Sequence, residues 1–290
     1  MFLPTVLAAS DPISHVVDKP IVGGFSMHVV TLIVAALLVV WALMVAAKAI
    51  DTGSESEGHD RYVTKGVFSQ MIEVIVLYLR DTVIRPQLGA DTNKFLPYLL
   101  TLFFFILFNN LIGLVPLMDV QHLFGLHNLY IGGTATGNLA VTAALATVAF
   151  FVINVSGLIH LGPKQYLMHF TGGVPVTLGM IPVILIMIPV EIMGMFIKPA
   201  ALAIRLFANM TAGHVLLAVL MGFTAAGLDA LGPAGGAPIT LISLVAAIGI
   251  MFLEIFVAFL QAFIFMFLTA LFIAQFRHHH DDEHAEAAHA

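Results

Sequence analysis

The sequence has no cysteine and little charge. Its 290 residues include 11 lysines and arginines and 17 aspartates and glutamates, so that charged residues make up 10% of the chain. The absence of cysteine excludes a disulfide framework, a thiolate metal site and a covalently attached haem. The H-E-x-x-H, G-x-S-x-G and P-loop patterns are also missing, which argues against a zinc protease, a serine hydrolase and a nucleotide-binding enzyme. Without a basic stripe interleaved with aromatic residues, nucleic acid is not an expected partner.

Apolar residues are abundant instead. They account for 60% of the chain, and the mean hydropathy is +1.03. Such a composition is typical of integral membrane proteins. We therefore expect an all-α integral membrane protein with about five to six membrane helices. Its net charge of −6 is uninformative, because the acidic residues cluster in one linker and the tail.

Proline and charge divide the chain into three regions. Residues 1–25 are mixed and interrupted by prolines, which indicates an exposed amino-terminal arm. Residues 26–276 hold every long apolar run and are expected to form a single membrane domain. Residues 277–290 form a polar carboxyl-terminal tail, whose histidines are interpreted as solvated rather than as a metal site.

The apolar runs predict the individual spans. Five candidate spans are followed by one longer run, over residues 26–47, 95–117, 134–161, 174–197, 200–227 and 239–276. Pro182 and Pro189 predict that the fourth span is kinked or broken, and Lys198 followed by Pro199 predicts a bend. Loops or linkers are expected over residues 48–66, 118–133, 162–173 and 228–238.

Two segments depart from a simple upright bundle. Residues 67–85 predict a shorter amphipathic helix, with Glu73 and Arg80 on one face and Pro86 at its end. A position along the membrane surface is favoured for it. The last run, residues 239–276, would be roughly 57 Å long as one helix, against a hydrocarbon core of about 30 Å. It must therefore tilt steeply or project from the bilayer.

Basic residues predict the orientation. Those between the first two spans are Lys48, Arg61, Lys65, Arg80, Arg85 and Lys94. Lys164 and Arg277 fall on the same side if the third and last spans end there, and only Lys19 faces the other way. The positive-inside rule then places the amino terminus outside and the carboxyl terminus in the cytoplasm.

Arg205 is the residue that the apolar region tolerates least. Arginine does not lose its charge in proteins, and at the bilayer centre it costs roughly 2.5–3.5 kcal/mol on insertion scales. It therefore needs a partner or a water-lined path. An ion pathway is favoured over a structural ion pair, because ionisable groups at this depth are usually functional.

Helical spacing organises the polar residues near Arg205. Asn209 and Ala212 share its stripe, whose small neighbours leave room for another helix. In the last run Glu254 and Gln261 are seven residues apart and share a face. Either Glu254 or a carboxylate from another subunit could neutralise the arginine. In the second span, Asn109 and Asn110 are expected to join helices by hydrogen bonds.

Two titratable groups flank this cation. Glu191 lies about 21 Å before Arg205 along an unbroken helix, too far to neutralise it. His214 lies beyond Arg205 and points to the opposite face, where Glu254 is the candidate acid. Carboxylates and imidazoles pass protons near neutral pH once their neighbours shift their pKa values. The pattern predicts two half-paths, short proton routes that open to opposite sides and are separated by a fixed positive charge.

The run AIRLFANMTAGH at residues 203–214, together with LQAFIFMFLT at residues 260–269, closely resembles subunit a of F-type ATP synthases. NNLIGLVP at residues 109–116 is similar to that family's second-span motif. The resemblance covers about residues 26–276. It implies two long, steeply tilted helices that form a hairpin around a rotor, which would explain the length of the last run.

The resemblance also implies roles for residues on both sides of the arginine. Arg205 would face the rotor's carboxylate, with Asn209 and Gln261 as its polar neighbours at the interface. Glu191 would lie on the cytoplasmic half-channel, and His214 with Glu254 on the outer one. The best-known bacterial members have Glu and His exchanged between these last two positions, whereas mitochondrial members share the present arrangement.

The implied protein is a non-catalytic channel subunit that couples proton flow to rotation and ATP synthesis. Its partners would be the proteolipid c-ring, peripheral-stalk b-type subunits, the remaining ATP synthase subunits and the lipid bilayer, without cofactor or metal. It would reside in a bacterial inner membrane, or alternatively in the mitochondrial inner membrane. The competing interpretation is a self-contained proton-coupled secondary transporter, whose two corresponding halves are not visible here.

Overall fold

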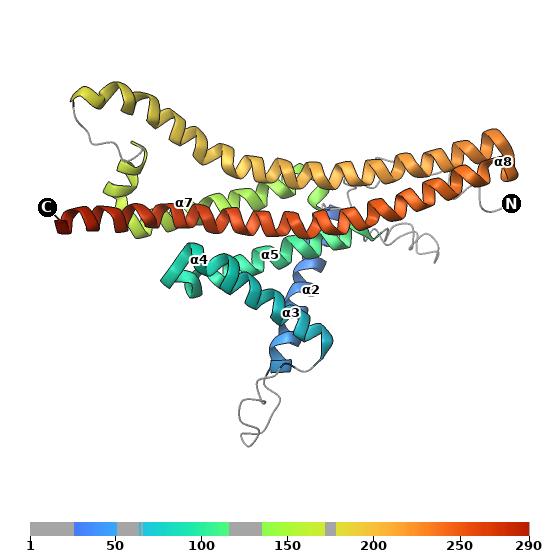
Figure 1. The fold of residues 1–290 in the computed structure, drawn as a ribbon, viewed down its shortest axis with the longest axis horizontal. Helices are drawn as coiled ribbons and strands as arrows, with labels where there is room; N and C mark the ends of the chain where they lie inside the picture. The colour runs from blue at the N-terminus through green and yellow to red at the C-terminus, as the bar shows by residue number, and fades with distance from the viewer. Residues whose placement is uncertain (1–25, 51–63, 65, 116–134, 172–177, 290) are drawn as a thin grey trace, which may run out of the picture. The chain divides into compact units, whose positions relative to one another are not determined.

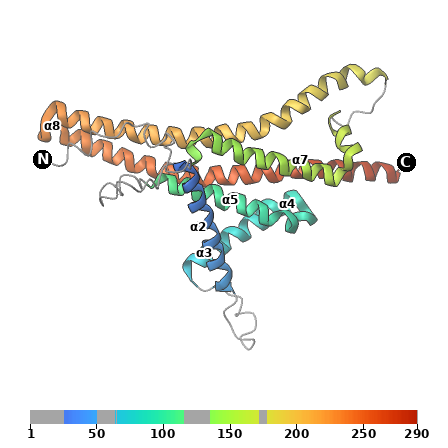
Figure 2. The ribbon, with the colours of Figure 1, turned by 180° about the vertical axis from the view of Figure 1, so that it is seen from behind.

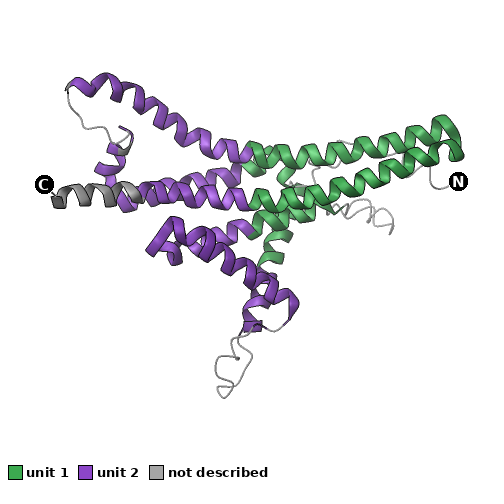
Figure 3. Cartoon of the chain, viewed as in Figure 1, with its two compact units in different colours: residues 1–39, 104–142, 204–262 green, residues 40–103, 143–203, 263–290 purple. Residues whose placement is uncertain are grey.

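The computed structural model describes residues 26–50, 64, 66–115, 135–171 and 178–289. The described part is almost entirely helical, which confirms the all-α class (Figure 1). It divides into two compact units that each combine three stretches of the chain (Figure 3). Unit 1 comprises Met1–Val39, Phe104–Thr142 and Ile204–Ala262, and unit 2 comprises Val40–Phe103, Ala143–Ala203 and Phe263–Ala290.

The first span is helix α2, Met27–Ile50. It agrees with the prediction, except that its last turn includes Lys48, which had been assigned to the linker. No proline or glycine interrupts it, and its side chains are apolar on every face, as expected for a helix surrounded by lipid and other helices.

The predicted amphipathic helix is longer than expected. Helix α3, Val67–Tyr78, continues through a π-helical turn, Leu79–Ile84, into α4, Arg85–Leu88. The prediction that Pro86 ends it was wrong, because helical backbone continues from the π-helical turn through Pro86 to Leu88. The helix ends at Gly89, whose φ of 53° favours glycine. Its place at the membrane surface stays a prediction.

The second span is α5, Thr92–Leu114, which agrees closely with the sequence. The third is α7, Leu139–His169, after a short 3-10 turn, Ala135–Gly137. The loop predicted from residue 162 was wrong. Gly162 kinks the chain with φ 72° and ψ 165°, and the helix then resumes at Pro163. Proline fits the first position of a helical segment because its missing N–H is not needed there.

The element α8, Ile181–His289, consists of two helices that meet at Gly232. A complete break at Pro182 or Pro189 is not present, because the only non-helical backbone within α8 is at Gly232. The kink expected at these prolines and the bend expected after Lys198 stay predictions. Proline is tolerated in membrane helices where neighbouring groups satisfy the freed carbonyl. The backbone of α8 also continues through residues 277–289 of the predicted polar tail.

Gly232 folds α8 into a hairpin, with φ 69° and ψ 179°. The long loop predicted over residues 228–238 was therefore wrong. Within unit 1 the two arms touch through small residues, since a Cβ on Gly227 would lie 3.1 Å from Ile239 and one on Gly236 would lie 2.8 Å from Leu228. The views from both sides show these arms side by side (Figures 1 and 2). The hairpin agrees with the family resemblance.

Among the described residues, four helical stretches are long and apolar enough to cross a membrane, over Met27–Ile50, Val67–Leu114, Leu139–Met168 and Ile181–Phe276. Because the last stretch folds back at Gly232, it contributes two arms of membrane-spanning length. This agrees with the lower end of the predicted number of spans. The predicted amino-terminal arm, most of the first linker, the loop over residues 118–133 and the start of the fourth span lie outside the described residues.

Candidate functional site

Arg205 lies on the exposed face of the first arm of α8. Within unit 1, Asn209 and Ala212 are also exposed, whereas Leu206 and Met210 on the other side of the arm are buried. The stripe predicted from helical spacing is therefore present as an accessible surface. The arm buries its apolar side against the rest of unit 1 and presents the guanidinium outward.

No acidic side chain within the described ranges forms an ion pair with Arg205. Glu254, the acid that the sequence offered from within this chain, is turned toward Gly213 instead. A guanidinium at membrane depth that lacks an acid of its own unit requires a counter-charge from elsewhere. Of the two predicted ways to neutralise Arg205, an ion pair with Glu254 is not made in the described part of the chain.

Asn209 connects the arginine stripe to the second arm. Its Nδ2 donates to Oε1 of Gln261 at 3.2 Å. Gln261 is 2% exposed, so this amide is held inside the hairpin while Asn209 remains exposed beside Arg205. Two of the residues predicted to neighbour the arginine are thus joined directly.

Glu254 is enclosed by the hairpin. Its side chain is buried and lies against Gly213, where a Cβ would overlap Oε1 and come within 2.8 Å of Cδ. Only a glycine leaves space for the carboxyl group at that position. His214 is the next residue and is half-buried. The turn of the first arm that carries the imidazole therefore also receives the acid from the second arm.

The asparagines of α5 behave differently from each other. Asn110 Nδ2 donates to the carbonyl oxygen of Ala258 at 3.3 Å, which joins α5 to the second arm as predicted. Asn109 Nδ2 donates instead to Phe105 of its own helix at 2.7 Å. The prediction of a helix-joining bond thus holds for Asn110, whereas the bond that Asn109 makes is internal to α5.

Glu191 lies in unit 2, beside a small cavity of about 30 Å³. That volume has room for about two water molecules. The cavity is lined by residues of α7, of the first arm of α8 and of the end of the second arm. Its polar lining residues are Asn154, Tyr166, Glu191, Lys198 and Gln275, and its aromatic ones are Phe150, Tyr166, Phe170, Phe272 and Phe276.

Lys198 is fixed within this cavity. Its Nζ donates to Oε1 of Gln275 at 3.3 Å and lies 5.0 Å from the ring centre of Phe272. The ammonium therefore has both a hydrogen-bond acceptor and an aromatic face within its own unit. Glu191 and Lys198, predicted from their spacing to share a face of the helix, do line the same space.

The six residues predicted from the sequence fall into two groups. Glu191 belongs to unit 2, and the others belong to unit 1, namely Arg205, Asn209, His214, Glu254 and Gln261. Sequence reasoning missed Gly213, Tyr166 and Asn154. Gly213 lies within the recognised motif, but Tyr166 escaped notice because its segment was assigned to a loop.

Comparison with known proteins gives a consistent result. The family described as ATP synthase A chain matches residues 28–274. A protein of Myxococcus xanthus described as ATP synthase subunit a is 36% identical over 291 residues, which cover 98% of this chain and 85% of that protein. One of Chlorobium phaeobacteroides with the same description is 40% identical over 280 residues, covering 94% and 73%. ATP synthase subunit a 2 of Prosthecochloris aestuarii is 38% identical over 292 residues, covering 99% and 80%.

Proposed function

The chain belongs to the ATP synthase A chain family, and we propose that it carries protons along two half-paths that Arg205 keeps apart. Members of this family are the proton-translocating membrane subunit of F-type ATP synthases, so the chain is one part of a larger complex. A self-contained secondary transporter is therefore set aside. The chemistry of ATP takes place in partner subunits.

The outer half-path passes through unit 1, by way of His214 and Glu254. Several side-chain polar atoms there are buried and lack a hydrogen-bond partner within the described part of the chain, namely Asn109 Oδ1, Asn110 Oδ1, Thr211 Oγ1, Glu254 Oε2 and Gln261 Nε2. Buried polar groups normally have a partner, and bound water commonly serves as one. The presence of these atoms in unit 1 supports a hydrated route past Glu254.

The inner half-path passes through the cavity beside Glu191 in unit 2. Its room for about two water molecules and the polar side chains among its lining residues support a route by which a proton reaches Glu191. A carboxylate can accept and release a proton, and Glu191 is the acidic side chain among the residues that line this cavity. We assign Glu191 to the cytoplasmic side.

Arg205 separates the two routes by charge. A proton from the outer half-path neutralises a carboxylate on the rotating proteolipid c-ring, and that ring subunit then leaves the arginine and enters the lipid. After nearly a full turn it releases the proton toward Glu191. Arg205 attracts the ionised ring carboxylate and blocks direct passage of protons. The membrane potential supplies about 2.3 kcal/mol per elementary charge for each 100 mV.

The remaining assignments concern the surroundings of the chain. The complex would include peripheral-stalk b-type subunits beside the c-ring. We place the chain in a bacterial inner membrane, with its amino terminus outside and its carboxyl terminus in the cytoplasm. The excess of lysine and arginine between the first two spans supports this orientation.

The observation that carries the proposal is the exposure of Arg205 without an acidic partner in the described part of its own chain. In inverted membrane vesicles, Arg205→Ala should abolish ATP-driven proton pumping, while the ATPase activity of the detached catalytic sector survives. Immunoblotting of the membranes controls for the amount of subunit. Unchanged pumping by Arg205→Ala would refute the proposal.

A further inference from the structure

The end of α7 covers the cavity beside Glu191. Gly162 kinks the helix with a φ of 72°, and the following residues, 163–171, form what we call the covering segment. Two of its side chains, Tyr166 and Phe170, line the cavity. The kink is what directs them there, since a straight continuation of α7 would follow a different course. A φ in this range is readily adopted by glycine alone.

Tyr166 fastens the covering segment to the body of α7. Its hydroxyl donates to Oδ1 of Asn154 at 2.7 Å. The amide is oriented for this bond, because Asn154 Nδ2 already donates to the carbonyl oxygen of Phe150 at 2.7 Å. The Tyr166 ring also contacts Phe276 and Phe170, with ring centres 5.7 Å and 5.5 Å away.

The packing around Tyr166 depends on a second glycine. Gly157 on α7 faces the ring of Phe276, and a Cβ there would lie 2.9 Å from the ring. Phe276 can therefore approach α7 closely and support the Tyr166 ring from the side. The Tyr166 hydrogen bond and these aromatic contacts help to hold the covering segment, and Gly162 joins it to the rest of the helix.

The hydrogen bond has a consequence for water in the cavity. While Tyr166 and Asn154 are bonded, the hydroxyl hydrogen and the amide oxygen are engaged with each other, and the surrounding wall is largely aromatic. When the bond breaks, both groups become available to bind water beside Glu191. The cavity then changes from a poorly hydrated space into a polar one that continues to the carboxylate.

We propose that the covering segment is a gate on the inner half-path and that the bond between Tyr166 and Asn154 is its latch. The inference rests on the proposed function, since a gate matters only if the cavity carries protons. With the latch closed, few water molecules reach Glu191. With the latch open, the segment pivots at Gly162 and water connects Glu191 to the solvent. Tyr166 and Asn154 are positioning residues in this scheme.

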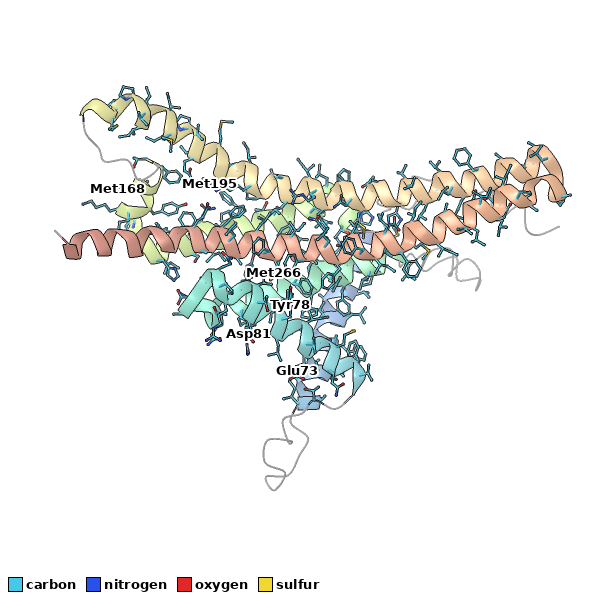
Figure 4. All side chains as sticks on the ribbon, viewed as in Figure 1. Glu73, Tyr78, Asp81, Met168, Met195 and Met266 are labelled. Atoms are coloured by element: carbon cyan, nitrogen blue, oxygen red, sulfur yellow. The ribbon has the colours of Figure 1, made fainter. Side chains whose placement is uncertain are left out.

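The absence of cysteine from the chain allows a direct test. Met195, which is labelled in Figure 4, lines the cavity. Its sulfur lies 3.9 Å from the Tyr166 hydroxyl. In vesicles that contain the whole complex, the rate at which N-ethylmaleimide modifies Met195→Cys reports access to the cavity. Tyr166→Phe removes only the hydroxyl, and Asn154→Leu removes the acceptor. Each should raise the rate about fivefold, the factor that one net hydrogen bond contributes to an equilibrium.

The double variant separates a latch from a general loosening. Because both substitutions remove the same bond, their combination should react no faster than either one alone. Tyr78→Phe, on an exposed tyrosine of α3, is the matched control and should leave the rate unchanged. A rate that Tyr166→Phe does not raise, or effects that multiply in the double variant, would overturn the gate.

Proton conduction then separates the gate from the proposed function. This measurement uses vesicles in which the subunit lacks the introduced cysteine. After the catalytic sector is removed from them, Tyr166→Phe should raise passive proton conduction about twofold or more, and Glu191→Gln should lower it strongly. Normal conduction by Glu191→Gln would overturn the inner half-path, and the function of the gate with it. A different pair of results would overturn the gate alone. In that case Glu191→Gln would reduce conduction, but Tyr166→Phe would not change the rate at which maleimide modifies Met195→Cys.

Discussion

Lys198 and Arg205 are two cations on one helix, seven residues apart, yet their surroundings differ. Lys198 has an acceptor in Gln275 and an aromatic partner in Phe272, both within unit 2. Arg205 is exposed and has no ion pair among the residues described in this chain. The comparison teaches that the lysine has partners within its own unit, whereas the arginine has no acidic partner among the described residues, as its proposed pairing with a ring carboxylate requires.

The two acids differ in a similar way. Glu254 of unit 1 is buried against Gly213, in a space that only a glycine leaves open. Glu191 of unit 2 is half-buried beside a cavity with room for about two water molecules. Glu254 is therefore held by tight packing, whereas Glu191 lies beside open space. Substitutions that change packing should affect the first region far more than the second.

Among substitutions that test packing, the largest effect is expected from Gly213→Val. The new side chain would occupy the position of the Glu254 carboxyl and displace it. Since misplacing a reacting group by about 1 Å can cost about a hundredfold, ATP-driven proton pumping in vesicles should fall about tenfold to a hundredfold. Gly249→Val, at a glycine with nothing within 4 Å of its Cβ position, is the control and should pump nearly normally. Equal pumping by both variants would contradict the role of packing.

Gly232→Ala should destabilise the hairpin. Its φ of 69° with ψ of 179° lies in a region that residues other than glycine avoid, at a cost of about 1–3 kcal/mol. The temperature at which the purified complex loses this subunit should fall by a few degrees. Gly222→Ala, within the helix and without a close neighbour, should keep or raise that temperature. An unshifted temperature for Gly232→Ala would mean that the turn adapts without strain.

Breaking the bond between Asn209 and Gln261 should have an intermediate effect. Asn209→Leu and Gln261→Leu each remove one partner of a bond between the two arms. A net hydrogen bond of about 0.5–1.5 kcal/mol corresponds to a loss of pumping of roughly threefold to tenfold. The two substitutions should not be additive, because they remove the same contact. Fully multiplying losses would show that the residues act separately.

Lys198→Met should have the smallest effect. It removes a single bond of 3.3 Å made by an ammonium that already has local partners, and interactions of exposed charges contribute little. Pumping should therefore fall by no more than about threefold. Gln275→Leu, which removes the other partner, should behave in the same way. If Lys198→Met abolished pumping as Arg205→Ala is expected to, the contrast between the two cations would be wrong.

Much of this organisation could be predicted from the sequence. Long apolar runs indicated the spans, and the 3.6-residue period placed Arg205, Asn209 and Ala212 on one stripe that the structure exposes. The length and conformation of the turns were harder to predict from the sequence. Glycine- and proline-rich segments at residues 162–173 and 228–238 were interpreted as loops, yet one glycine of positive φ sufficed in each. Composition indicates that the chain turns, but not how tightly.

The cavity beside Glu191 shows what was missed. Tyr166 stood in a predicted loop, so nothing in the local pattern connected it to Asn154 or to the acid. Gly213 is part of the sequence motif, but the motif does not show why a glycine is needed there. The structure gives the reason, because the Glu254 carboxyl group lies against Gly213. Such contacts join residues that are far apart in the sequence, so the helical period does not predict them.

The sequence by itself determined the membrane class, the family and the identity of the charged residues, because hydropathy and helical period are local properties of the chain. The tertiary structure decided which of those charges is satisfied internally. Lys198 finds Gln275 across 77 residues, and Asn110 finds Ala258 across 148. Pairing at such distances depends on how the arms fold back and pack, and this is why the exposure of Arg205 without an acid became visible only in the folded chain.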